Sequence, residues 1–257
     1  KVIDSYSGKV AGRVDERGVV QLSAKYVMDA ISELAWKTAD PGMIFLDCVN
    51  RDNPLPNLGP MTATNPCGEQ PLHPYDACNL GSINLAKMIK ESKKQGRKEV
   101  DYEKLERTTR LATRFMDNVN DANRGPIPEI EQTVKSHRRI GLGVMGWADM
   151  LAHLEISYDS EEARELAKKV MGRITDVAKK TSVELAKEKD VFPAFSGSKY
   201  DNGKPEDRVR NVERTTIAPT GTISMLTDVS SGIEPYFAVT FEKKIRGGDS
   251  LFYTLPL

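Results

Sequence analysis

Apolar side chains recur at helical spacing in two long segments of the chain, residues 23–39 and 160–189. Positions three and four residues apart fall on one face of a helix, so this spacing predicts two core-packing helices. Ser160 stands directly before the longer segment and is a typical N-cap residue. Residues 102–120 are also predicted to be helical.

Short apolar runs alternate with these helices. Residues 43–46 form a run of the kind that makes a buried strand, and residues 215–218 form another that ends at Pro219. Long helices between short strands, with few hairpin turns, favour parallel pairing because parallel neighbours need a long crossover. The pattern therefore predicts an α/β fold with mainly parallel strands.

Composition adds limits to this picture. The 257 residues include 37 basic and 37 acidic side chains, so no long-range field favours nucleic acid or a membrane surface as a partner. No apolar run approaches the roughly 20 residues of a membrane-spanning helix, and the amino terminus lacks a signal pattern. We therefore expect a cytoplasmic protein. The start at Lys1 and the stop within an extended segment at residues 254–257 indicate a fragment of a longer polypeptide.

Cysteine and histidine are scarce. Three cysteines are an odd number, which argues against a disulfide-stapled secreted domain. Cys48 lies in an apolar run and is expected to be a core thiol. The histidines at positions 73, 137 and 153 lack ligand-like spacing, so no metal site is expected.

Cys67 lies between an amide and an acid. If residues 65–69 are extended, alternate side chains share one face, which would bring Asn65, Cys67 and Glu69 together. Pro66 stiffens the backbone and Gly68 leaves room for a ligand. The pattern indicates a reactive thiol beside an acid or base, although a buried cysteine in a proline-rich turn remains an alternative.

The segment Pro219-Thr220-Gly221-Thr222-Ile223-Ser224 follows a predicted strand and precedes a predicted helix. Its backbone N–H groups and hydroxyls can cradle a phosphate, or the segment can simply cap the helix. The lysine and spacing of a nucleotide-hydrolysing loop are absent.

Residues 141–146 formally match the Gly-x-Gly-x-x-Gly pattern of dinucleotide-binding folds. Residues 136–139, which precede them, do not form a hydrophobic strand, so we reject that interpretation. The glycines are instead expected to allow close helix packing, next to the pair Arg138 and Arg139.

Two longer strings strongly resemble the ribonucleotide reductases: Thr64-Asn65-Pro66-Cys67-Gly68-Glu69-Gln70-Pro71-Leu72 and Cys78-Asn79-Leu80-Gly81-Ser82-Ile83-Asn84-Leu85. The sequence of the first string is most similar to the class II, adenosylcobalamin-dependent branch. Further family motifs occur in the expected order: Asp40-Pro41-Gly42, Arg138-Arg139-Ile140-Gly141-Leu142-Gly143, Ala218-Pro219-Thr220-Gly221-Thr222 and Gly232-Ile233-Glu234-Pro235.

This resemblance implies a fold and a chemistry. The fold is the ten-stranded α/β barrel of that family with Cys67 on a central finger loop, and residues 1–257 form its central-to-late part, incomplete at both ends. Cys67 becomes a transient thiyl radical that removes the 3′ hydrogen of the substrate ribose. Glu69 acts as a general base on the 3′ hydroxyl and Asn65 bonds the substrate. Residues 219–224 grip the phosphates of a ribonucleoside di- or triphosphate.

The resemblance also implies cofactor and partners. Cys78 matches one of two cysteines that supply the reducing electrons; the other lies upstream in the family, and Cys48 is in the wrong place to replace it. The chain alone is therefore not expected to complete a turnover. Adenosylcobalamin is the implied radical source. The implied partners are a dithiol reductant such as thioredoxin, the remainder of the reductase chain and, in an assembly, a second copy in a homodimer.

Three alternatives stay open at this point. The class I, iron-dependent large subunit shares the superfamily and differs in its radical source. A thiol-disulfide oxidoreductase would use Cys67 and Cys78, but these are 78 − 67 = 11 positions apart and no Cys-x-x-Cys motif is present. A non-catalytic fragment is the third, because an incomplete barrel leaves strand edges unpaired.

Overall fold

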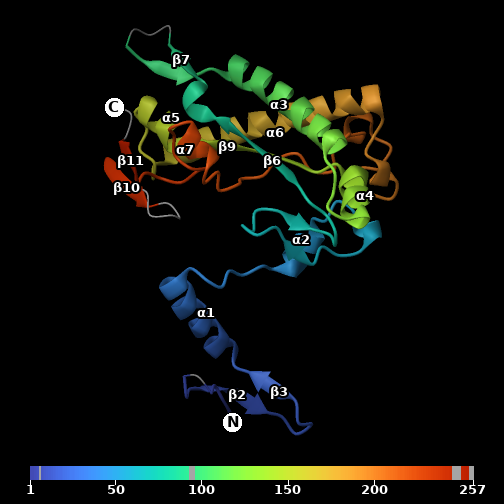
Figure 1. Ribbon diagram of the computed structural model, residues 1–257, viewed down its shortest axis with the longest axis vertical. Helices are drawn as coiled ribbons and strands as arrows, with labels where there is room; N and C mark the ends of the chain where they lie inside the picture. The colour runs from blue at the N-terminus through green and yellow to red at the C-terminus, as the bar shows by residue number, and fades with distance from the viewer. Residues whose placement is uncertain (6, 93–95, 245–249, 255–257) are drawn as a thin grey trace. The chain divides into compact units, whose positions relative to one another are not determined.

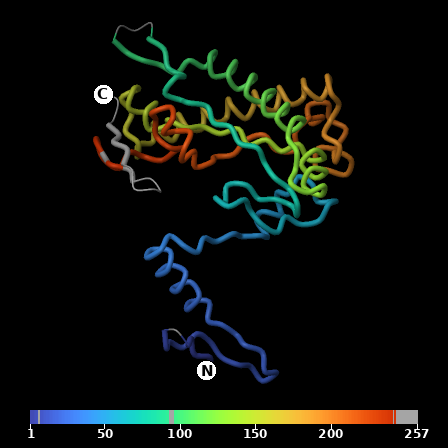
Figure 2. Tube along the Cα trace, in the orientation of Figure 1, coloured from blue at the N-terminus to red at the C-terminus, as the bar shows by residue number. Residues whose placement is uncertain are grey.

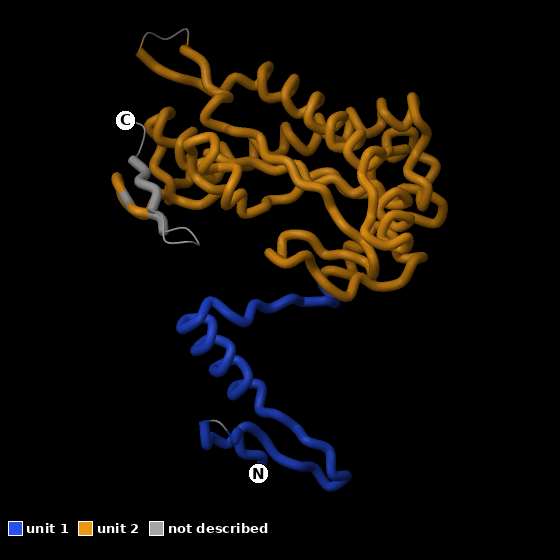
Figure 3. Tube along the Cα trace, viewed as in Figure 1, with its two compact units in different colours: residues 1–48 blue, residues 49–257 orange. Residues whose placement is uncertain are grey.

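A computed structural model describes residues 1–5, 7–92, 96–244 and 250–254. The chain divides into two compact units, Lys1–Cys48 and Val49–Leu257, which Figure 3 colours separately. Within the described residues, no helix is both long and apolar enough to cross a membrane.

Unit 1 is a small antiparallel sheet followed by a helix. Strands β1 (Val2–Ile3), β2 (Val10–Val14) and β3 (Val20–Leu22) pair in sequence order. Helix α1 (Ala24–Thr38) begins at the cap Ser23, whose side chain accepts a hydrogen bond from Tyr26 N. The predicted helix over residues 23–39 is thus confirmed.

The predicted strand over residues 43–46 is wrong. Residues 43–45 have no regular structure, and Leu46 begins helix α2 (Leu46–Arg51). Met43, Ile44 and Phe45 are exposed, so the burial that would favour a strand is missing. Cys48 lies in the same helix and is exposed, which overturns its prediction as a core thiol.

The centre of unit 2 is a parallel pair of strands. β6 (Asn79–Asn84) pairs with β9 (Ile140–Met145) from Asn79↔Ile140 to Asn84↔Met145. All six residues of β9 are buried. On the other side of β9, its backbone N–H groups at Ile140 and Leu142 donate to Glu213 O and Arg214 O. Residues 213–216 therefore run along β9. Where a strand over residues 215–218 was predicted, the structure has a single bridge, Leu142↔Thr215.

Long helices pack on this centre (Figures 1 and 2). They are α3 (Tyr102–Ala122), α4 (Pro128–His137), α5 (Trp147–His153) and α6 (Glu161–Lys189). The helical predictions over 102–120 and 160–189 are confirmed, and Ser160 caps α6 by accepting from Ala163 N. A shared core joins strands and helices through side chains such as Ile83, Val144, Leu105 and Ile174.

The remaining strands form antiparallel hairpins: β4 (Ala63–Thr64) with β5 (Pro71–Leu72), β7 (Ile89–Glu91) with β8 (Lys98–Val100), and β10 (Thr240–Lys244) with β11 (Ser250–Thr254). The expectation of mainly parallel pairing holds at the centre and is wrong elsewhere, because short connections return each strand beside its predecessor. The fold is mixed helix and sheet, and the described strands do not close into a barrel. Short helical turns complete it: η1 (Pro56–Leu58), η2 (Leu85–Lys87), η3 (Pro193–Phe195), η4 (Pro205–Asp207) and α7 (Ile223–Leu226).

The glycines of β9 serve strand packing, so the expectation that they allow close helix packing is wrong. A Cβ atom at Gly143 would clash with the backbone oxygen of Thr216. A Cβ atom at Gly141 would lie 2.8 Å from Thr216 Cγ2 and 3.0 Å from Cys78 Sγ. The two glycines therefore let residues 213–216 and Cys78 approach β9 closely. The rejected dinucleotide-binding pattern is still not supported, since α4 rather than a strand precedes β9.

Candidate active site

Cys67 lies in the turn of the β4–β5 hairpin. Gly68 N donates to Asn65 O at 3.0 Å, which closes a β-turn, and Gly68 has a φ of +84°. Asn at the first position, Pro at the second and Gly at the fourth are the residues that such a turn favours. The expected extended geometry is therefore wrong for residues 65–69, and a tight loop presents the thiol instead.

The side chain of Asn65 fastens this loop. Its Oδ1 accepts from Gln70 N at 3.0 Å, and its backbone N donates to Gln70 O at 3.1 Å. Residues 65 and 70 thus form the base of a four-residue loop, a hairpin length that is commonly built around such a turn.

A cavity of about 450 Å³ joins this loop to a distant segment. One wall contains Asn65, Cys67 and Glu69, and a second wall is residues 218–223. Leu80, Gly81 and Ser82 of β6 complete the lining. The structure thus brings together three of the four predicted catalytic residues and most of the predicted phosphate segment.

Glu69 carries a buried carboxylate oxygen without a partner. Its Oε2 has no hydrogen-bond partner among the described residues. A buried, unsatisfied acceptor is costly and calls for an explanation, such as a ligand that donates to it. Cys67 is a free, exposed thiol beside it.

In the second wall, two hydroxyls have partners within the protein. Thr220 Oγ1 accepts from Gly232 N at 2.7 Å, and Ser224 Oγ bonds Ser231 Oγ at 2.9 Å. Both hydroxyls are buried. Thr220 Oγ1 only accepts in its bond and keeps its own proton to donate, and Thr220 lines the cavity, whereas Ser224 does not. The groups that can face a ligand are the Thr220 and Thr222 hydroxyls and the backbone N–H groups of residues 221–223.

Asp149 holds the segment behind this wall, and the sequence analysis missed it. The carboxylate is fully buried in α5 and accepts from Ser230 N at 2.8 Å, Ser230 Oγ at 2.7 Å and the Tyr236 hydroxyl at 2.5 Å. Burial, followed by the bond to Asp149, raises the pKa of Tyr236. An acidic residue inside the apolar run of residues 147–151 was the available signal.

Cys78 stands apart from the cavity. It directly precedes β6, is partly buried and is not among the residues that line the cavity. Burial raises the pKa of its thiol to about 12, and the negative charge of Glu213 acts in the same direction. Cys78 therefore stays a protonated thiol at neutral pH.

A buried charge network lies beside Cys78, centred on Arg139. Its Nε donates to Asp76 Oδ2 at 2.5 Å, its Nη1 donates to Glu213 Oε2, and its Nη2 donates to His73 Nδ1 at 3.2 Å. Burial disfavours the charge of Arg139, but Glu213 and Asp76 together raise its pKa. Burial alone would raise the pKa of Asp76, yet hydrogen bonding from His137 and the charge of Arg139 lower it.

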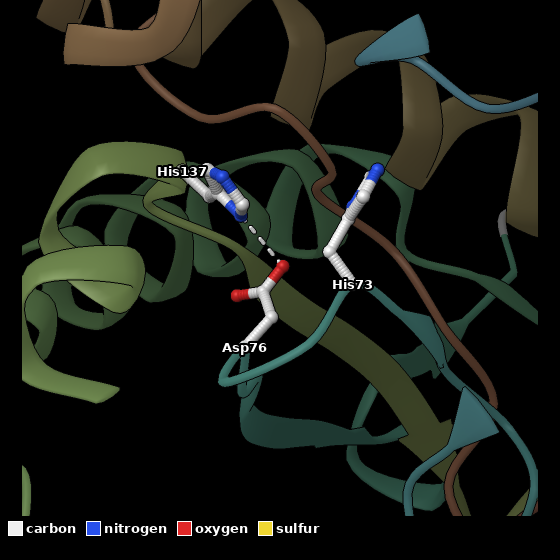
Figure 4. Close-up of side chains that lie close together, drawn as sticks. All are labelled: His73, Asp76 and His137. Carbon is white, nitrogen blue, oxygen red and sulfur yellow. Dashed lines mark hydrogen bonds and ion pairs between the residues drawn. The ribbon is translucent and has the colours of Figure 1, made fainter. Parts of the chain in front are cut away.

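The network includes three potential metal ligands (Figure 4). Ligand atoms of His73, Asp76 and His137 lie within 4.8 Å of one another, and His137 Nδ1 donates to Asp76 Oδ2 at 2.7 Å. The spacing of His73 and His137 along the sequence therefore did not reveal that they lie close together in the fold. His73 Nε2 lies 3.1 Å from Gly59 O, so both of its ring nitrogens have partners. With the Arg139 guanidinium already bound to this set, a hydrogen-bond network accounts for the cluster better than a metal ion does.

His73 is neutral in this arrangement. A carbonyl only accepts and a guanidinium only donates, so the ring proton lies on Nε2. Burial and then the positive charge of Arg139 lower the pKa of His73, which agrees with that assignment.

Comparison with known proteins identifies the family. Residues 5–255 match the family described as "Ribonucleotide reductase, barrel domain". The vitamin B12-dependent ribonucleoside-diphosphate reductase of Thermoplasma acidophilum is 50% identical over 237 residues, which cover 92% of this chain and 30% of that protein. The protein of the same name from Mycobacterium tuberculosis is 44% identical over 247 residues, which cover 96% of this chain and 33% of that protein. The ribonucleoside-diphosphate reductase subunit alpha of Chlamydia pneumoniae is 32% identical over 299 residues, which cover 100% of this chain and 27% of that protein.

The chain thus spans about a third of the length of the curated relatives it matches. The family match nevertheless extends over nearly all of its residues. The chain belongs to the family of ribonucleotide reductase barrel domains.

Proposed function

We propose that this chain is the central-to-late part of the barrel of a vitamin B12-dependent ribonucleotide reductase, which reduces ribonucleoside di- or triphosphates. The two relatives with 50% and 44% identity carry that type of name. The observation that carries the proposal is the cavity, which unites Cys67 and Glu69 with a segment about 150 positions away. In the complete protein, the remainder of the chain closes the ten-stranded barrel around the loop, which then acts as its finger.

Cys67 is proposed to act as the radical carrier. Its sulfur radical takes the hydrogen atom from C3′ of the ribose, so that an S–H bond forms as the C–H bond breaks. The Glu69 carboxylate, whose Oε2 lacks a partner among the residues that the structure describes, accepts the proton of the 3′ hydroxyl. Asn65 uses its Oδ1 within the loop and offers its Nδ2 to the substrate.

Cys78 is proposed to be one of two reducing thiols. Loss of the 2′ hydroxyl as water takes up two electrons and two protons, and two thiols supply them as they close to a disulfide. Its raised pKa keeps Cys78 in the protonated form that this step requires. The second thiol comes from the remainder of the reductase chain, so residues 1–257 alone are expected to be inactive.

The substrate's phosphates are proposed to lie against residues 219–223. Backbone N–H groups of residues 221–223 and the Thr222 hydroxyl donate to them. Thr220 and Ser224 belong to the proposed phosphate segment, and their bonds to Gly232 N and Ser231 Oγ also shape this wall.

Adenosylcobalamin is proposed as the cofactor. Pro66, Cys67 and Gly68 are exposed at the tip of the loop, so the thiol is open to a group that is too large for the cavity. When bound, the cofactor supplies a radical by homolysis of its cobalt–carbon bond. A dithiol reductant such as thioredoxin restores the cysteine pair, and the enzyme is proposed to act in the cytoplasm as a homodimer.

Substitution of the thiol in the complete reductase tests this proposal. Cys67→Ser is expected to abolish both ribonucleotide reduction and hydrogen exchange at the cobalamin carbon, because both need the sulfur radical. Cys48→Ser, which removes an exposed thiol, is the matched control and should retain activity. Reduction of nucleotides by the Cys67→Ser enzyme would refute the radical role, and wild-type activity without adenosylcobalamin would favour the iron-dependent class instead.

A further inference from the structure

The loop that carries Cys67 and Glu69 is tied to residues 213–216 at two points. Thr216 Oγ1 donates to the backbone oxygen of Glu69 at 2.9 Å. Gln70 Nε2 donates to Glu213 Oε2, and Gln70 is buried. The residue directly after Glu69 is thus held by its side chain as well as by the hairpin.

Glu213 is in turn held by Arg139. The same oxygen, Glu213 Oε2, accepts from both Gln70 Nε2 and Arg139 Nη1. Arg139 is fully buried and directs its other two nitrogens to Asp76 and His73. A planar guanidinium bonded on three sides has little freedom, so it fixes the position of Glu213.

Charge makes the arginine necessary. Asp76 is fully buried and Glu213 is partly buried, and holding these two carboxylates close together without a cation would be costly. Lysine would keep the charge, but its single ammonium lacks the rigid fork that holds Asp76, Glu213 and His73 at once.

We infer that Arg139, acting through Glu213 and Gln70, is a positioning residue that fixes the Cys67–Glu69 loop against the cavity. This inference rests on the proposed function for its catalytic consequence, whereas its structural consequence can be measured without any activity.

Arg138 provides the matched control. It is the preceding residue, equally buried, and it also binds carboxylates, at 2.8 Å from Asp117 and 2.6 Å from Asp121. Those partners lie on α3, and among the described contacts Arg138 makes no bond to the loop of residues 65–70. Arg138→Lys and Arg139→Lys therefore make the same chemical change in two neighbouring buried networks.

The experiment compares these variants, and Gln70→Leu, in the complete reductase chain. Arg139→Lys and Gln70→Leu are expected to speed backbone amide exchange at residues 65–70 about tenfold. They should also lower kcat about 100-fold with KM for the nucleotide within about threefold, because misplacement by about 1 Å has costs of that order. The double variant should lose no more than either single variant, since both break one path. Arg138→Lys should lower Tm and leave exchange at 65–70 and kcat nearly unchanged.

Two results would overturn the inference. In one, Arg139→Lys behaves like Arg138→Lys, with a lower Tm and normal exchange at residues 65–70. In the other, kcat and KM change in equal proportion in Arg139→Lys. If the wild-type enzyme reduces no ribonucleotide, the proposed function fails instead, and the exchange measurement still decides whether Arg139 positions the loop.

Discussion

The two walls of the cavity are held in place by different kinds of interaction. The Cys67 wall rests on a buried network in which Arg139 binds Asp76 and Glu213. The Thr222 wall rests on hydroxyls and backbone N–H groups, with Asp149 as its one buried carboxylate among the described contacts. Ionic bonds in a low-dielectric interior are strong and directional, which suits a thiol that must be placed accurately.

The difference also bears on how an anion binds. Among the described residues that line the cavity, none is lysine or arginine. The proposed phosphate binding therefore depends on backbone N–H groups and hydroxyls, whose partial charges suffice only when several converge. We expect changes in the Cys67 wall to act on kcat and changes in the Thr222 wall to act on KM, and the predictions for Glu69 and Asp149 below test that division.

Glu69→Gln should give the largest effect of these. The amide keeps the size of the side chain but cannot take a proton, and general bases contribute about 100- to 10,000-fold to rates. We expect kcat of the complete enzyme to fall about 1000-fold with KM within about threefold. Steady-state kinetics check this, with Glu206→Gln, an exposed glutamate in η4, as the control. A KM increase that matches the kcat loss would show that Glu69 binds substrate and does not act as a base.

Thiol reactivity sharpens the charge comparison. The thiolate is the reactive form, and a pKa of about 12 leaves Cys78 protonated at pH 8. Iodoacetamide should therefore alkylate Cys78 at least about 100-fold more slowly than exposed Cys67, as measured by mass spectrometry. Because the pKa is raised, the Cys78 rate should keep rising from about pH 8 to pH 11, by about tenfold per unit.

Glu213→Gln tests the cause of that reactivity. It removes a negative charge that disfavours the thiolate, so Cys78 alkylation should quicken several-fold, while the exposed Cys48 serves as the internal reference. Equal alkylation rates for Cys67 and Cys78 in the wild-type protein at pH 8 would contradict the description of Cys78 as a thiol whose ionisation is disfavoured by burial and by the charge of Glu213.

Local patterns predicted the helices well, because helical spacing and caps are properties of neighbouring residues. The cap at Ser160 and the apolar face of α6 both follow from sequence. The turn at Cys67 was also within reach, since Asn65, Pro66 and Gly68 occupy the positions that a β-turn favours. Asn65, Cys67 and Glu69 do line one cavity, but a tight turn places them there and not the alternation of an extended strand.

Long-range contacts could not be predicted in this way. Arg139 is 63 positions from Asp76 and 74 from Glu213, and only the tertiary fold brings them together. The same holds for Asp149, which the sequence analysis missed and which binds Ser230, 81 positions away. Residues 43–46 show the opposite error, because an apolar run does not specify a strand unless another element buries it.

Asp149→Asn should give the smallest effect, and it tests the second wall. The change keeps the shape of the side chain and removes the charge that strengthens the bonds from Ser230 and Tyr236. Looser packing of residues 230–232 would loosen the proposed phosphate loop, through the bonds of Thr220 and Ser224. If ordering the looser loop costs about 1.4 kcal/mol of binding free energy, KM rises about tenfold. We expect kcat to stay within about twofold. Ser224→Ala, which removes one bond of this wall, should raise KM only about twofold. If Asp149→Asn lowered kcat and spared KM, the two walls would not divide binding from chemistry.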